Sequence, residues 1–175
     1  MTLIQDVGMA DRLEVWLTRN GKRTLLRETM PNHGLKRWVI KFGKLFGFFD
    51  RYMEDLVVTA GKAAVANLLT TDSGTQCFKY TGIGQDSTAP APGQTALLNQ
   101  YKRQVADNMT RVTTNVANDT MQSTTTFNIT DTVSLVESGL FDAPSGGNML
   151  CRQTFAPINL QNGDQVTFIW KIVVT

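Results

Sequence analysis

The chain has 175 residues, of which 42% are hydrophobic, and a formal net charge of +2. This length fits one domain, or one domain with a smaller appendage, and the hydrophobic content excludes a wholly disordered chain. No apolar run approaches the roughly 18 residues of a membrane span. The first fifteen residues, MTLIQDVGMADRLEV, meet a charge before they build an apolar run, so we also expect no secretory signal peptide.

The charges are unevenly distributed along the chain. Residues 1–62 contain eleven Lys or Arg against seven Asp or Glu, whereas residues 63–175 contain six against eight. Such a split predicts two regions with different neighbours. We expect an N-terminal arm over residues 1–74 and a β-sandwich domain over residues 75–175.

The N-terminal arm is expected to contain a β-hairpin over residues 12–29. Asn20-Gly21 separates the apolar runs LEVWL and RTLL, which is a strong hairpin signal. Further along, Thr59 is expected to cap a helix over residues 60–69, directly after a short β-type run at residues 56–58.

Between these elements, residues 35–55 combine aromatic and basic side chains at near-helical spacing. The segment could pack on the chain's own sheet, on the next subunit, on an anionic partner or on a membrane surface. We favour packing of this segment on the chain's own sheet or on the next subunit, and we expect no specific contact with nucleic acid or membrane. Buried aromatic side chains dominate interface energetics, so the expected interface anchors are Trp38, Phe42, Phe46 and Phe49.

From residue 78 onward the pattern is β. Residues 78–84 read as a strand, residues 85–93 (QDSTAPAPG) as a loop, and residues 95–105 as a segment that begins with a short helix. Strands are expected near residues 111–116 and 121–130, with a turn at Asn118-Asp119 and threonines on solvated faces. The last strand is the clearest: its alternate residues Val166, Phe168, Trp170, Ile172 and Val174 share one face. The fold class is therefore mainly β, an antiparallel β-sandwich or barrel preceded by the hairpin and a short helix.

The stretch VESGLFDAPSGGNMLCRQTF, residues 136–155, raises the question of catalysis because it gathers a carboxylate, a cysteine and an arginine. Val133, Leu135 and Glu137 alternate, so Glu137 is expected on the same face as its two apolar neighbours. A catalytic glutamate normally needs a second titratable group nearby, and the only local candidate, Asp142, precedes a tight turn. We interpret the stretch as strand, turn and strand, with Glu137 accepting backbone N–H groups or pairing with Arg152 or Arg103.

Residues that could carry other chemistry are sparse. The two cysteines, Cys77 and Cys151, are too few for a disulfide framework and are expected as small buried residues in strands. The single histidine, His33, cannot form a multi-histidine metal site. Paired carboxylates and a supported Cys–His partnership are also missing, which argues against a virion-associated hydrolase. We expect no catalytic residues, no cofactor and no metal.

The segments YTGIG, LVVTAGKAAVANLL and ESGLFDAPSGGNMLCRQTFAPINLQNGDQVTFIWKI resemble a group of small virion proteins of tailed bacteriophages over about residues 56–175. They are more loosely similar to the N-terminal region of phage tail-collar fibre proteins. The resemblance implies a non-enzymatic structural component of the virion that is assembled in the host cytoplasm. It would form a homo-oligomer and contact major capsid, tail or neck proteins, either as a capsid decoration or cement or at the neck, tail or baseplate.

The alternative is a receptor- or carbohydrate-binding β module of a tail fibre or spike. Its ligand would be held by the loops at residues 85–93 and 143–148, because sandwiches often present ligands on loops. These loops contain no aromatic residue to stack on a sugar ring, which counts against this alternative.

Overall fold

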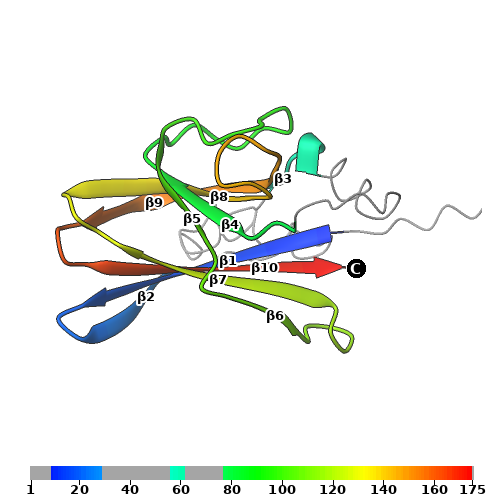
Figure 1. Cartoon of the computed structure of the whole chain (residues 1–175), viewed down its shortest axis with the longest axis horizontal. Coiled ribbons are helices and arrows are strands. Elements are labelled where there is room, and N and C mark those ends of the chain that lie inside the picture. Colours follow the sequence, from blue (N-terminus) through cyan, green and yellow to red (C-terminus); the bar gives the residue numbers. More distant parts are fainter. Residues whose placement is uncertain (1–8, 29–55, 62–76, 175) are drawn as a thin grey trace, which may run out of the picture.

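The computed structural model describes residues 9–28, 56–61 and 77–174. These residues form two antiparallel five-stranded sheets that pack face to face, so the predicted β-sandwich is confirmed (Figure 1). Sheet 1 has the order β2-β1-β10-β7-β6, with β2 spanning Lys22–Glu28, β1 Met9–Arg19, β10 Gln165–Val174, β7 Thr120–Asn128 and β6 Asn108–Val112. Sheet 2 has the order β3-β9-β8-β4-β5, with β3 spanning Leu56–Val57, β9 Met149–Leu160, β8 Val133–Phe141, β4 Tyr80–Gly84 and β5 Gln100–Val105.

The predicted N-terminal hairpin is present as β1 and β2. Asn20 and Gly21 form its turn with φ of 50° and 71°, the left-handed conformations that a two-residue hairpin turn requires. β1 also pairs with β10, from Met9 opposite Val174 to Thr18 opposite Gln165. The hairpin is therefore an integral part of sheet 1, while the boundary at residue 74 stays a prediction.

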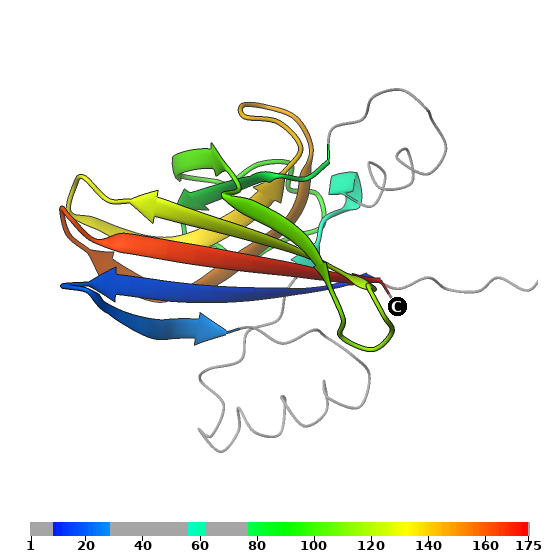
Figure 2. The same ribbon diagram turned by 60° about the horizontal axis from the view of Figure 1, so that its bottom comes forward.

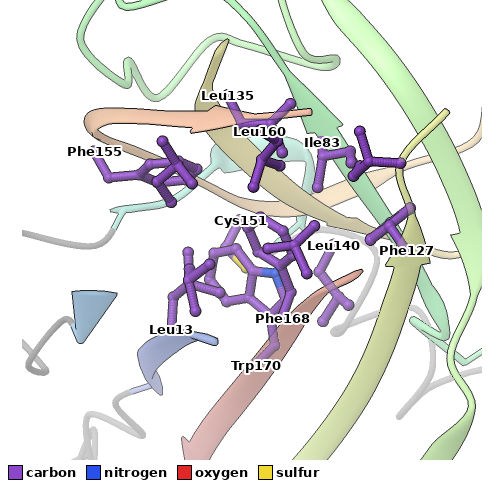
Figure 3. Packing of buried hydrophobic residues seen from close by; sticks show 14 of the residues in the cluster. Leu13, Ile83, Phe127, Leu135, Leu140, Cys151, Phe155, Leu160, Phe168 and Trp170 are labelled. Carbon is purple, nitrogen blue, oxygen red and sulfur yellow. The ribbon is translucent and has the colours of Figure 1, made fainter. Parts of the chain in front are cut away.

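The two sheets enclose one main hydrophobic core (Figure 3). Phe168 and Trp170 of β10 are fully buried, as the alternation in the last strand predicts, whereas Val174 at its end is 55% exposed. Phe168 meets Phe127 edge to face with the ring centroids 5.9 Å apart. Burial of each such side chain contributes roughly 2 kcal/mol to stability. β10 is also the middle strand of sheet 1, so its buried side chains lie at the centre of the core.

Polar side chains also join the two sheets inside the core. The hydroxyls of Thr81 on β4 and Thr125 on β7 lie 2.8 Å apart, and both residues are fully buried. The indole N–H of Trp170 donates to the hydroxyl of Ser138, which donates in turn to the carbonyl of Gly82. The expectation that the threonines coat solvated faces is therefore wrong for Thr125, whose hydroxyl has a partner across the sandwich.

The segment before β4 attaches to the edge of sheet 2. β3 pairs with β9. A helix begins at Thr59, one residue before the predicted start at residue 60, so Thr59 is the first residue of the helix and not only its cap. Any Cβ at Gly61 would overlap the main chain of Leu150, so only glycine permits this close approach of helix to strand. Residues 62–69 of the predicted helix lie outside the described residues.

Two further expectations are wrong. Residues 94–99 form an irregular segment instead of a short helix, because their backbone groups bind a side chain of sheet 2, as shown below. Cys77 is exposed and precedes β4, whereas Cys151 is buried in β9 as expected. The two cysteines do not form a disulfide with each other.

Candidate functional site

Glu137 lies on the outer face of sheet 2, because a β-bulge interrupts β8. The register with β9 shifts between Leu135 and Glu137, so the side chains before and after the bulge alternate in opposite phase. Leu135 points into the core, and so do Ser138 and Leu140 after the bulge. The prediction that Glu137 shares a face with Val133 and Leu135 is therefore wrong.

The segment of residues 85–99, here called the cover segment, folds over this outer face (Figure 1). The carboxylate of Glu137 fastens it by accepting backbone N–H groups from both of its ends. Asn99 donates at 2.9 Å, and Asp86 and Leu98 each donate at 3.3 Å. Because Glu137 is fully buried, these bonds replace the water that its charge would otherwise require.

Arg152 of β9 holds the same segment from beside Glu137. Its Nε donates to Glu137 Oε2 at 2.8 Å, and both side chains are fully buried. Its Nη1 donates to the carbonyl of Thr88 at 2.8 Å and to the side chain of Gln94 at 3.2 Å. We call Glu137 and Arg152 together the clamp, since both bind the cover segment from sheet 2. Glu137 accepts hydrogen bonds from backbone N–H groups of the segment, and Arg152 donates hydrogen bonds to its oxygens.

Glycines on sheet 2 make room for the clamp and its cover. A Cβ at Gly84 would overlap the Glu137 carboxylate and the carbonyl of Asn99. A Cβ at Gly82 would lie 2.8 Å from the ring of Phe141 and 3.1 Å from Leu97. Leu97 and Phe141 belong to a second apolar cluster, which also contains Val58 and Met149. The glycines of β4 thus leave the space that the cover segment and its buried side chain Leu97 occupy on the outer face of sheet 2.

The turn after β8 is held by charged side chains. Asp142 accepts hydrogen bonds from the backbone and side-chain amides of Asn148, at 2.7 and 2.8 Å. Arg103 of β5 donates to the carbonyls of Ala143 and Gly146, and its guanidinium lies 3.4 Å from the ring centroid of Phe141. Burial lowers the pKa of Arg103. Residues 136–155 are therefore strand, turn and strand, as predicted.

The clamp is built to hold the chain's own backbone. The two oxygens of Glu137 accept four hydrogen bonds, all from groups of this chain, and the cover segment separates them from solvent. The predicted role of Glu137 as an acceptor of backbone N–H groups and a partner of Arg152 is confirmed, whereas Arg103 acts elsewhere. Within the described ranges, no group of three or more His, Cys, Asp or Glu side chains could hold a metal ion.

The four predicted interface residues, Trp38, Phe42, Phe46 and Phe49, lie outside the described residues. Sequence reasoning did not foresee that Gln94 and the carbonyl of Thr88 would complete the clamp. The only signal in the sequence was the placement of a polar, Pro-containing loop between two strands, which does not reveal its partners. Sequence reasoning also missed that Arg19 and Asp164 join the first hairpin to the turn before β10, with atoms 2.8 and 2.6 Å apart.

A family model described as podophage GP4 fiber I protein gp80 matches residues 49–174, more than half of the chain and every strand from β3 to β10. The chain belongs to this family. It is accordingly a tail-associated structural protein of a bacteriophage and a component of the virion. The clamp, the cover segment and the turn of residues 143–148 all fall inside the matched region.

A search of the curated proteins finds no match. The looser similarity to tail-collar fibre proteins stays a prediction. Within the parts of the chain that the structure describes, no helix has the length and apolar character needed to cross a membrane.

Proposed function

We propose that this chain is a non-enzymatic building block of a podophage tail fibre, present in several identical copies in each particle. The observation that carries the proposal is the match of residues 49–174 to a podophage fibre protein family. Virion parts are built by repetition of identical subunits, so a homo-oligomer is the expected state. Its partners would be other tail or neck proteins of the same virion.

The contacts of the sandwich support a mechanical role. The clamp fixes a segment without regular secondary structure to sheet 2 through six hydrogen bonds, five of them to backbone groups. Charge-assisted hydrogen bonds of this kind are about twice as strong as neutral ones. The outer face of sheet 2 is thereby given a rigid surface made of chain backbone and small side chains, which suits a subunit that must keep its shape in an assembly.

The same contacts argue against a catalytic role for Glu137. The deeply buried carboxylate of Glu137 is bonded to Arg152 and to three backbone N–H groups, which leaves no face of it open to a substrate. A general acid or base must reach the proton that it transfers, directly or through one water. The carbohydrate-binding alternative gains no support either, because the clamp holds part of the loop of residues 85–93 against sheet 2.

Immunogold electron microscopy of intact virions tests the proposed location. An antibody raised against the full chain should place gold at the tail fibres, in several copies per particle. Antibody absorbed beforehand with the purified chain serves as the control and should leave the particles unlabelled. Gold distributed over the capsid faces would overturn the fibre proposal in favour of a decoration or cement protein.

The oligomeric state has its own test. Light scattering of the purified full chain should give a mass that is a multiple of 19.4 kDa. Substitution of Trp38 and Phe42 by Ala examines whether the aromatic segment contributes to the association. A chain that is monomeric alone and also in the presence of isolated tails would rule out assembly in multiple copies.

A further inference from the structure

Among the described residues, β2 forms one outer edge of sheet 1 and pairs with β1 alone. Figure 2 shows β2, in the lighter blue, beside β1 at one side of the sandwich. Residues 22–25 of this strand are exposed, and Leu25 has 39% of its surface accessible. On its second edge, this strand has no ladder partner in the part of the chain that the structure describes. Such an edge can accept an extended segment of another chain.

The edge strand carries positive charge that the fold does not neutralise. Lys22, Arg23 and Arg27 have no carboxylate within salt-bridge distance among the described residues. By contrast, Arg19 on the neighbouring strand binds Asp164, and Lys171 binds Glu14 at 2.6 Å. The guanidinium of Arg23 lies over the ring of Trp16, 4.5 Å from its centroid, which holds this charge at the surface beside Leu25.

A groove of about 150 Å³ adjoins the same edge on the inner side of the sheet. It lies between the first hairpin and β9, and its lining is Leu17, Leu26, Arg27, Pro157, Ile158 and Asn159. Four of the six lining residues are apolar and two, Arg27 and Asn159, are polar, so the groove has room and apolar contacts for one small aliphatic side chain. In an added strand successive side chains point to opposite faces, so alternate residues would reach the groove and the basic outer face.

We propose that the β2 edge docks an extended, acidic segment of another virion protein by strand addition. The inference rests on the proposed function and names the chemistry of the partner. Backbone hydrogen bonds to β2 would supply affinity, a carboxylate on the outer face would lie beside Arg23, and an aliphatic side chain would fill the groove on the inner face. Lys22 lies next to Arg23 at the turn end of the strand and adds to the positive charge there. A second copy of β2 suits this edge less well than an acidic segment, because antiparallel pairing about Leu25 would place Arg23 opposite Arg27 of the other copy, and only Lys22 would meet an opposite charge, at Glu28.

The test uses the full chain and a blocked synthetic peptide of alternating glutamate and valine, with binding followed by fluorescence anisotropy of a label on the peptide. The control peptides replace glutamate by lysine, or carry N-methyl groups on alternate backbone amides. The edge variant combines Lys22→Glu with Arg23→Glu. Its matched control is Arg111→Glu, an exposed cation on β6 at the opposite edge of the same sheet.

We expect the glutamate peptide to bind the wild-type chain and the Arg111→Glu variant equally, and the edge variant at least about tenfold more weakly. The lysine peptide and the N-methylated peptide should not bind. Binding that survives N-methylation, or that Arg111→Glu weakens as much as the edge variant, would overturn the inference, and so would no binding at all. Circular dichroism confirms that each variant is folded.

The two proposals fail separately. Peptide binding is measured on the isolated chain, whereas gold labelling reports the position in the particle. Gold at the fibres without peptide binding would reject the docking edge alone, and gold on the capsid would reject the fibre role whatever the peptide does.

Discussion

Arg152 Nε lies 2.8 Å from Glu137 Oε2, and neither side chain has any accessible surface. The two residues come from adjacent strands of sheet 2 and are buried by a segment that they themselves hold in place. Because a buried charge is costly without a partner, each residue of the clamp depends on the other.

Substitution Glu137→Gln should therefore destabilise the fold strongly. The glutamine amide keeps the size of the side chain but leaves Arg152 without a counter-charge, and its NH2 group faces backbone N–H donors. We expect a loss of about 3 to 5 kcal/mol in the free energy of unfolding, measured by urea denaturation at neutral pH. Asp131→Asn, at an exposed carboxylate that accepts from Tyr101, is the control and should change stability by less than about 0.5 kcal/mol. Equal effects of the two substitutions would contradict the role of the clamp.

Substitution Gly84→Ala tests the space beneath the cover segment. The new methyl group would overlap the carboxylate of Glu137 and the carbonyl of Asn99, so the clamp would have to move. We expect a loss of about 1 to 3 kcal/mol and faster amide hydrogen exchange at Asn99. Gly93→Ala, in the cover segment above, is the matched control, because a Cβ there meets no atom within 4 Å. Its stability should be unchanged or slightly higher, and a comparable loss in both variants would show that the close contact at Gly84 is not the cause.

The hydroxyl pair between Thr81 and Thr125 predicts strongly non-additive substitutions. Either Thr→Val change keeps the shape of the side chain but leaves one buried hydroxyl without its partner, at a cost of about 1 to 3 kcal/mol. The double variant removes both hydroxyls and should lie close to the wild type in stability. A double-mutant cycle by chemical denaturation measures the coupling. Additive losses would mean that the two hydroxyls do not depend on each other.

The contact between Arg19 and Asp164 predicts acid sensitivity. The hydrogen bond from Arg19 lowers the pKa of Asp164 below its ordinary value, helped by the backbone N–H of Gln161 and opposed by burial. A carboxyl with a lowered pKa in the folded state contributes stability above its unfolded pKa of about 4, and that contribution is lost as the pH falls below this value.

Melting temperatures measured between about pH 6 and pH 2 should accordingly fall less steeply for Asp164→Asn than for the wild type. Arg19→Gln should flatten the curve in the same way, because it removes the cause of the lowered pKa. Curves of wild type and both variants that run parallel over this range would show that the pair does not contribute to acid sensitivity.

Features that depend on neighbouring residues were predictable. The hairpin at Asn20-Gly21 follows from the left-handed backbone that these residues accept, and β10 follows from its period-two alternation. The strand, turn and strand of residues 136–155 could be predicted because Ala-Pro-Ser-Gly-Gly favours a tight turn. The family match was consistent with the predicted resemblance to phage virion proteins.

The face on which Glu137 lies was not predictable. Simple alternation assigns it to the core face with Leu135, and the bulge that reverses the phase depends on the pairing of β8 with β9. Residues 94–99 present the same difficulty, because their conformation follows the carboxylate of Glu137, almost forty positions away in the sequence. Neither the face of Glu137 nor the conformation of residues 94–99 is indicated by the residues next to them in the sequence.

The sequence by itself thus determined the β class, the hairpin turn and the apolar stripe of the last strand, since side-chain period and turn chemistry act between residues a few positions apart. Only the tertiary structure decided that β1 lies beside β10, that Glu137 and Arg152 meet on the outer face of sheet 2, and that β2 is the outermost described strand of sheet 1. The physical reason is that strand pairing and the burial of charge join residues far apart in the chain. Their free energy depends on the complete arrangement of the strands.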